Sequence, residues 1–197
     1  MTSTTSDHVL SAEQLRQRFD AGATFDTYVA TGNEDQQRGW RDVYDRATLD
    51  SAQQSLVQSW TRSMNVIVSS GVWCGDCVQQ GPLIQRIADA NDRIQVRWLD
   101  RDQHLELAEQ LKICGGLRVP VAVFMAEDFE PVSIYGDRTL TRYRAIAARQ
   151  LGAACQLPGA PLDEDELRGT LQDWLQEFER VALLLRLSGR LRQKHGD

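Results

Sequence analysis

The stretch Ser69-Ser70-Gly71-Val72-Trp73-Cys74-Gly75-Asp76-Cys77 decides the fold prediction for this chain of 197 residues. Its two thiols are one helical turn apart, a spacing that suits a reversible disulfide. The apolar run Asn65 to Ser70 predicts a short buried strand, and the apolar periodicity of Val78 to Ala90 predicts a helix. Cys74 is therefore expected at or just before a helix start, where free backbone N–H groups and the helix dipole favour a thiolate. Only the thiolate attacks a disulfide.

Length, composition and charge limit the class of protein. With 42% hydrophobic residues, the chain can bury a full core, which predicts one domain with helical additions. Residues 1–7 are polar, and about 18 apolar residues nowhere run together. The sequence therefore predicts no signal peptide and no membrane span, and we expect a cytoplasmic protein. A net charge of −6 argues against a nucleic-acid partner. One group of arginines is typical of a solvated helix face: Arg138, Arg142, Arg144 and Arg149.

The cysteine content points to chemistry at the C-x-x-C pair. Four cysteines are too few for a disulfide scaffold, and a reducing compartment does not preserve structural disulfides. A zinc site that adds Cys114 and a histidine to Cys74 and Cys77 is an alternative, but the sequence offers no second C-x-x-C or H-x-x-x-H half-site, and we predict no metal. Cys114 is expected to be a buried small residue, with a third redox thiol as the alternative, and Cys155 to be incidental.

The chain divides into four parts. Residues 1–62 predict a helical N-terminal extension, residues 63–152 a single domain, residues 153–161 a linker, and residues 162–197 a long amphipathic helix. In the C-terminal part, apolar residues recur three and four positions apart. They are Leu167, Leu171, Trp174, Phe178, Val181 and Leu185. This stripe must be buried against the N-terminal helices, which we prefer, or against a second copy of the chain, so the protein is expected to be a monomer or a homodimer through this helix.

Strand and helix patterns alternate within the central part. The predicted strands are 65–70, 94–99, 119–125 and 132–135, and the predicted helices are 78–90, 105–113 and 139–151. This order predicts an α/β fold with a central mixed sheet and helices on both faces. The helix at 139–151 is expected to cover the sheet.

The segment from about Met64 to Arg149 resembles the thioredoxin superfamily, and Trp73 to Cys77 looks like the motif of a Trp-Cys-Gly-Asp-Cys subgroup. Three features carry the resemblance: the tryptophan before C-x-x-C, Pro82 at the position of a helix-kinking proline, and Val119-Pro120 at the position of the family's cis-proline. The resemblance implies a thioredoxin-like fold with N- and C-terminal helical extensions.

The resemblance also implies the roles of the motif residues. Cys74 is expected to be the nucleophile and Cys77 the resolving thiol, exchanging electrons with a disulfide-containing protein or small thiol substrate. Trp73 and Val119 are expected to bind substrate at the rim, the latter through its backbone. The residues expected to modulate the site are Gly75, Asp76 and Pro120.

Two departures from the family bear on proton transfer. Val68 occupies the position of a buried aspartate, and Trp98 that of its lysine partner. Deprotonation of Cys77 would then rely on water or on Asp76. A carboxylate near Cys74 is also expected to raise its pKa and to favour a reducing couple, with a potential more negative than about −220 mV.

These observations favour a cytoplasmic thiol-disulfide oxidoreductase with a redox-active disulfide and no bound cofactor. Its electron donor is expected to be a thioredoxin reductase or a low-molecular-weight thiol. The rival interpretation is a binding or scaffold protein that keeps the fold, docks a partner through its helical additions, and uses the thiols of Cys74 and Cys77 as a redox-sensitive latch.

Overall fold

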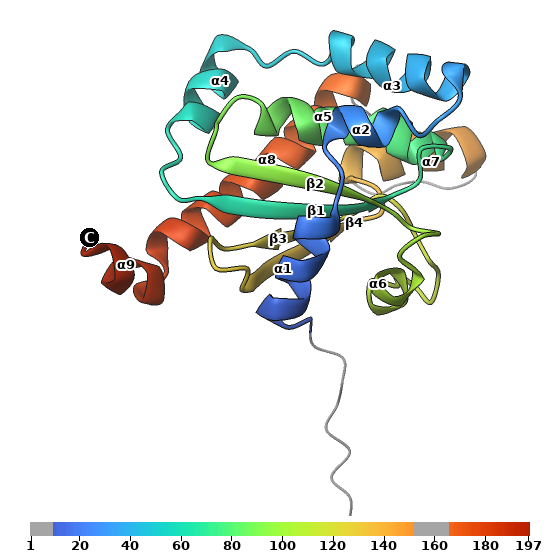
Figure 1. Cartoon of the computed structure of the whole chain (residues 1–197). Helices are drawn as coiled ribbons and strands as arrows, with labels where there is room; N and C mark the ends of the chain where they lie inside the picture. Colours follow the sequence, from blue (N-terminus) through green and yellow to red (C-terminus); the bar gives the residue numbers. More distant parts are fainter. Residues whose placement is uncertain (1–9, 152–165) are drawn as a thin grey trace, which may run out of the picture.

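A four-stranded mixed sheet lies at the centre of the computed structural model, which describes residues 10–151 and 166–197 (Figure 1). The strands are β1 (Met64–Ser70), β2 (Ile94–Asp100), β3 (Val121–Met125) and β4 (Pro131–Gly136). Their spatial order is β2-β1-β3-β4; β1 runs parallel to β2, and both other pairs are antiparallel. The predicted mixed sheet is confirmed, and the strand boundaries agree with the sequence to within two residues.

Burial explains the composition of the strands. Every residue of the central strands β1 and β3 is buried, which accounts for their unbroken apolar runs. Edge strand β4 is exposed or half-buried along its length. Because side chains alternate across a strand, Val66, Val68 and Phe124 enter one core cluster, whereas Ile67 and Val123 enter the cluster on the opposite face.

Helices cover both faces of the sheet, as the sequence predicts. The helices are α1 (Ala12–Ala21), α2 (Phe25–Val29), α3 (Glu34–Arg46), α4 (Ser51–Gln58), α5 (Gly75–Ala88), α6 (Leu105–Gln110), α7 (Leu140–Leu151), α8 (Glu166–Leu187) and α9 (Gly189–His195). α5 and α8 pack on the face with Phe124, and α3 lies on the outer side of α5 (Figure 1). α1 and α6 contribute to the core cluster on the other face. Within the described ranges, no helix combines the length and apolar character needed to cross a bilayer.

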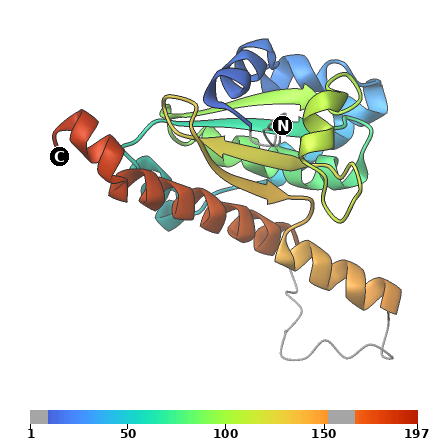
Figure 2. The same ribbon diagram turned by 90° about the horizontal axis from the view of Figure 1, so that it is seen from below.

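The amphipathic helix predicted near the C-terminus is α8, and its apolar stripe is buried within the chain. Phe178 packs edge-on against Phe124 of β3, and Trp174 against Tyr135 of β4, each with ring centroids 5.0 Å apart. The stripe therefore covers the sheet and α5, rather than packing mainly on the N-terminal helices as we expected. α7 does not cover the sheet as predicted; it packs on α8 and projects past the edge of the sheet (Figure 2). Aromatic side chains explain why α8 rather than α7 covers the sheet, because α8 buries more apolar area there than the arginine- and alanine-rich α7 could.

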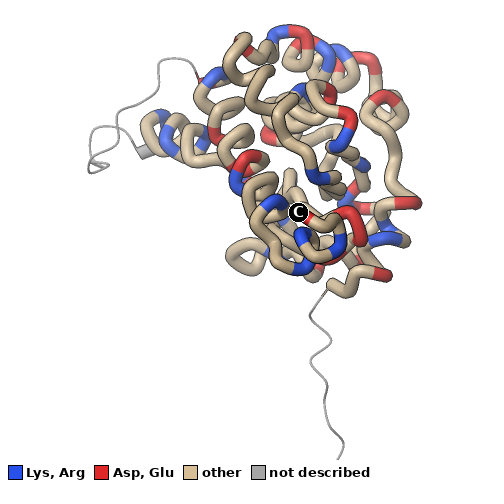
Figure 3. The backbone as a smooth tube through the Cα atoms, turned by 90° about the vertical axis from the view of Figure 1, so that its left-hand side faces the viewer, with Lys and Arg blue, Asp and Glu red and all other residues tan. Residues whose placement is uncertain are grey.

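The chain turns after α8 instead of continuing as one helix. The Ser188 hydroxyl accepts a hydrogen bond from the Leu191 N–H and caps α9. Basic residues of α9 then lie beside acidic residues of the β3–β4 turn (Figure 3). Arg190 pairs with Asp128, and Lys194 pairs with Glu127. These exposed pairs orient α9 against the turn, although each contributes little to stability.

A cluster of aromatic rings joins the N-terminal helices to the sheet and α5. Phe25 and Tyr28 of α2 and Trp40 of α3 surround Trp98 of β2, with the three ring centroids 5.5–5.7 Å from that of Trp98. Gly81 of α5 makes room for this cluster, because a Cβ there would lie 2.4 Å from the Trp40 ring. The sequence did not reveal α2, since five residues are too few to show a helical period.

Candidate active site

The two motif thiols lie where β1 passes into α5. Cys74 is the residue immediately before the helix, with φ −84° and ψ 124°, and its N–H donates to the Gly71 carbonyl over 2.9 Å. α5 begins at Gly75, three residues earlier than predicted, so that Cys77 lies in its first turn. A Cβ on Gly75 would contact nothing, which leaves the surface beside Cys74 open.

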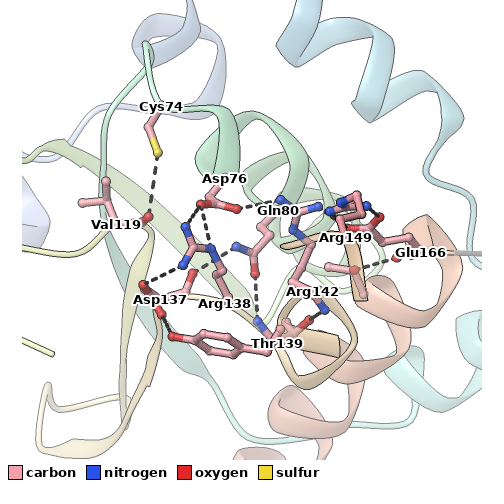
Figure 4. Close-up of polar contacts among 12 residues, drawn as sticks. Cys74, Asp76, Gln80, Val119, Asp137, Arg138, Thr139, Arg142, Arg149 and Glu166 are labelled. Atoms are coloured by element: carbon pink, nitrogen blue, oxygen red, sulfur yellow. Dashed lines mark hydrogen bonds and ion pairs between the residues drawn. The ribbon is translucent and has the colours of Figure 1, made fainter. Parts of the chain in front are cut away.

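The two thiols differ sharply in accessibility. Cys74 is half-buried, and its Sγ lies 3.8 Å from the Val119 carbonyl oxygen (Figure 4). Cys77 is fully buried, and its Sγ accepts a hydrogen bond from the Gly71 N–H over 3.5 Å. Both thiols are free in this structure. A partner disulfide can therefore reach Cys74 but not Cys77.

The acidities of the thiols also diverge. A hydrogen bond from Cys77 and the backbone N–H groups of Cys77 and Asp76 lower the pKa of Cys74 to about 6, against burial and the charge of Asp76. Burial, followed by the interaction with Cys74, raises the pKa of Cys77. At neutral pH the proton is therefore lost from the accessible thiol. As predicted, the charge of Asp76 acts to raise the pKa of Cys74. The other contributions outweigh it, so the pKa of Cys74 is lowered overall.

Asp76 is held by two arginines that sequence reasoning placed on a solvated surface. Its Oδ2 accepts from Arg138 Nε over 2.8 Å, and its Oδ1 accepts from Arg142 Nη2 over 2.6 Å (Figure 4). Arg142 and Arg149 both reach Glu166, the first residue of α8. This network ties the active-site helix to α7 and α8. No sequence signal links these residues, because the pairs are 17 to 66 positions apart.

The network makes Asp76 a stabilising residue with a defined pH dependence. Burial raises the pKa of Asp76, but hydrogen bonds and charges from Arg138 and Arg142 outweigh it and leave the pKa below its ordinary value. A carboxyl whose pKa is lower in the folded state stabilises the fold above its unfolded pKa, and this contribution disappears as the pH falls through the folded pKa.

We therefore expect Asp76→Asn to reduce the free energy of unfolding by about 1–2 kcal/mol at pH 7, because it removes the carboxylate charge that Arg138 and Arg142 share and leaves them only their other partners, Asp137 and Glu166. Urea denaturation at pH 7 and pH 3 measures the effect, and the difference from wild type should shrink at pH 3. Asp35→Asn is the matched control, since Asp35 pairs with Arg38 on the exposed surface of α3. An equal loss for Asp76→Asn at both pH values would contradict the assigned role of the carboxylate.

The expected substrate rim is only partly on the surface. Trp73 is 47% exposed, and the Arg101 guanidinium lies 4.7 Å from its ring centroid. The side chains of Val119 and Pro120 are buried, so the former faces the site through its carbonyl group. The peptide bond between them is cis. An exposed indole beside an accessible thiol offers an apolar contact for a partner.

The positions of the family's buried charged pair are occupied by apolar residues. Val68 and Trp98 are partners in the parallel register of β1 and β2, and both are buried. The Trp98 indole N–H donates to Gln85 Oε1 over 3.0 Å. Both Asp76 carboxylate oxygens accept from arginines, and the lowered pKa makes this carboxylate a weak base for Cys77.

Within the described residues, neither Cys114 nor the metal alternative gives a further site. Cys114 is exposed rather than buried as we predicted, and it has a φ of 50° in the turn between Ile113 and Gly116. Cys155 lies outside the described residues. Over residues 10–151 and 166–197, no three His, Cys, Asp or Glu side chains gather in a way that could hold a metal ion.

Comparisons with known proteins bear on the family. A structure of a protein of unknown function from Pseudomonas aeruginosa superposes with a TM-score of 0.68 at 16% identity, covering 88% of this chain and 97% of that one. An HIV epitope scaffold superposes with a TM-score of 0.66 at 17% identity, covering 84% and 95%. No curated protein matches the sequence. The family model for thioredoxin matches residues 22–148. The chain therefore belongs to the thioredoxin superfamily and has a thioredoxin-like fold with additional C-terminal helices.

Proposed function

We propose that this protein is a thiol-disulfide oxidoreductase that reduces disulfides of proteins or small molecules without a bound cofactor. The observation that carries the proposal is the pairing of an accessible Cys74, whose pKa is lowered to about 6, with a buried Cys77 one helical turn away. A low pKa supplies the attacking thiolate at neutral pH, and burial reserves the second thiol for an intramolecular step.

The proposed reaction has two displacements. The Cys74 thiolate attacks one sulfur of a substrate disulfide, forms a mixed disulfide with it and expels the other sulfur as a thiolate, which takes a proton. Cys77 then loses its proton and attacks Cys74 Sγ, which expels the second substrate thiolate. The substrate gains two electrons, and Cys74 and Cys77 end as a disulfide. A low-molecular-weight thiol or a thioredoxin reductase would return the pair to the dithiol.

Neighbouring groups support this assignment. The positive end of the α5 dipole and the N–H groups of Asp76 and Cys77 stabilise the Cys74 thiolate. Trp73 supplies an exposed apolar surface, and the Val119 backbone lies beside the thiol, where an extended substrate segment can pair with it. In this scheme, residues 63–152 carry the chemistry, residues 1–62 and 162–197 are extensions, and the cytoplasm is the compartment that keeps the dithiol reduced.

A second candidate function is a binding or scaffold protein with a redox-sensitive latch. One observation favours it: Val68 and Trp98, which face each other on β1 and β2, stand where a buried carboxylate and a lysine are expected in a general reductase. Insulin reduction by dithiothreitol, with and without the protein, separates the two. The reductase proposal predicts a rate well above the background of dithiothreitol alone, whereas a rate equal to the background would favour the scaffold.

A further inference from the structure

Two buried hydroxyl groups near the resolving thiol have no conventional partner. Tyr28 is 2% exposed and Ser70 is fully buried. Within the described part of the chain, neither the Tyr28 Oη nor the Ser70 Oγ makes a hydrogen bond of ordinary geometry, although Ser70 interacts with both Tyr28 and Cys77 through looser hydrogen bonds. Buried hydroxyl groups in native proteins rarely lack a well-formed hydrogen bond, so two such groups beside a reactive centre indicate a role there.

Both residues lie close enough to Cys77 to interact with it, Ser70 by a hydrogen bond and Tyr28 electrostatically. The Tyr28 ring stacks on Trp98 with centroids 5.6 Å apart and planes 22° from parallel, and Trp98 in turn pairs with Val68. Ser70 ends β1 and directly precedes Gly71, whose N–H donates to Cys77 Sγ. Helix α2 therefore brings the tyrosine to the buried region of Val68 and Trp98.

The electrostatics define what these hydroxyl groups can do. Burial raises the pKa of Tyr28 far above its ordinary value. A hydrogen bond with Ser70 lowers this pKa somewhat, and the charges of Cys77, Asp100 and Cys74 raise it further. Tyr28 therefore stays protonated, and its O–H can donate but cannot act as a base. A hydrogen bond from Ser70 also lowers the pKa of Cys77, against burial and the interaction with Cys74. Hydrogen bonds donated to the Cys77 sulfur thus favour its thiolate over its thiol.

We propose that the Ser70 and Tyr28 hydroxyl groups stabilise the Cys77 thiolate by hydrogen bonding when this residue resolves the mixed disulfide. The inference rests on the proposed exchange reaction and deepens it. As the proton leaves Cys77, Ser70 donates to the sulfur and Tyr28 donates to Ser70 or to the sulfur, so that negative charge in the buried site is shared by two O–H groups. Sulfur–sulfur bond formation to Cys74 then removes that charge, and the substrate thiolate departs. The N-terminal extension thereby contributes a residue to the site.

Stopped-flow reaction with 5,5′-dithiobis(2-nitrobenzoate) separates the two steps. Reduced protein carrying Cys114→Ser and Cys155→Ser should release two equivalents of thionitrobenzoate. The first release reports attack by Cys74 and depends on reagent concentration, whereas the second reports resolution by Cys77 and does not. Tyr28→Phe and Ser70→Ala should leave the first rate within about twofold and slow the second by about tenfold, since each removes an O–H group that donates to the developing thiolate or to its donor. The pH at which the second rate rises should move upward in both variants.

Tyr44→Phe is the matched control. Tyr44 also packs on Phe25, but its hydroxyl group donates to Asp89 at the other end of α5. We expect it to change neither phase. A second phase unchanged in both Tyr28→Phe and Ser70→Ala would overturn the inference, as would equal slowing of both phases, which would indicate a packing role. If the wild-type protein showed no first phase, the proposed function itself would fail.

Discussion

Cys74→Ser is expected to reduce the catalysed rate of insulin reduction by at least about 10³-fold, to the background of dithiothreitol alone, because it removes the nucleophile on which every later step depends. No other described thiol can replace it, since Cys77 is fully buried and Cys114 is exposed in a separate turn. Cys77→Ser should also lose turnover, but it should retain the first displacement. It should therefore accumulate a mixed disulfide between Cys74 and insulin that persists on a non-reducing gel.

Cys114→Ser is the control for both cysteine variants. It removes an exposed thiol in a turn separate from the site, and we expect wild-type turnover. Capture of insulin by Cys114 in the Cys74→Ser protein would refute the assignment of the nucleophile. So would a Cys77→Ser protein that turns over as fast as wild type, because resolution would then not need the buried thiol.

Trp174→Ala is expected to cause the largest loss of stability, about 3–5 kcal/mol. Trp174 is fully buried, stands edge-on to Tyr135, and donates its indole N–H to Gln80 Oε1 over 3.2 Å. The same amide oxygen accepts from the Thr139 N–H, and the Gln80 amide donates to the Asp137 carbonyl. The substitution thus opens a cavity between α8 and the sheet and disturbs a buried polar network.

Urea denaturation followed by far-ultraviolet circular dichroism measures this effect. Leu187→Ala on the same helix is the control, since Leu187 is 72% exposed and should change the free energy of unfolding by less than about 0.5 kcal/mol. Equal midpoints for wild type and Trp174→Ala would show that α8 is not part of the cooperative core.

The sequence allowed most of the central fold to be predicted, because the strands that decide it are buried on both faces. Val66 to Val68 and Val121 to Met125 read as strands without any knowledge of their partners. The stripe that contains Trp174 likewise predicted a helix. Periodicity shows that a face is buried but not what covers it, so the packing of α8 on the sheet and the displacement of α7 could not be predicted.

The candidate site was predictable where it depends on local spacing and not where it depends on distant contacts. The positions of Cys74 and Cys77 at the start of a helix follow from the motif. The pairing of Asp76 with Arg138 and Arg142, and the approach of Tyr28, follow only from the folded chain. The sequence predicts that the helix start favours the Cys74 thiolate and that the Asp76 carboxylate opposes it. It does not reveal the two counter-ions of that carboxylate or the hydrogen bond from Cys77, which is the largest cause of the lowered Cys74 pKa.

The lowered pKa of Cys74 also changes the expected redox behaviour. A thiolate that is stabilised in the reduced protein favours the dithiol and makes the pair more oxidising. The lowered pKa thus weighs against a potential more negative than about −220 mV, and that potential stays a prediction. With a pKa of about 6, Cys74 falls between the attacking thiols of thioredoxin, near about 7, and DsbA, near about 3.5.

The central claim is that Cys74 and Cys77 form a reversible disulfide, and the most direct test is to map that bond in defined redox buffers. The protein would be equilibrated with glutathione and dithiothreitol mixtures, quenched in acid, alkylated, and analysed by peptide mass spectrometry. We predict a single two-electron transition that joins Cys74 to Cys77, at a potential between about −270 mV and about −120 mV, the values for thioredoxin and DsbA. Thiols that stay unbridged at every ratio, or a disulfide that joins Cys74 to Cys114 instead, would contradict the account.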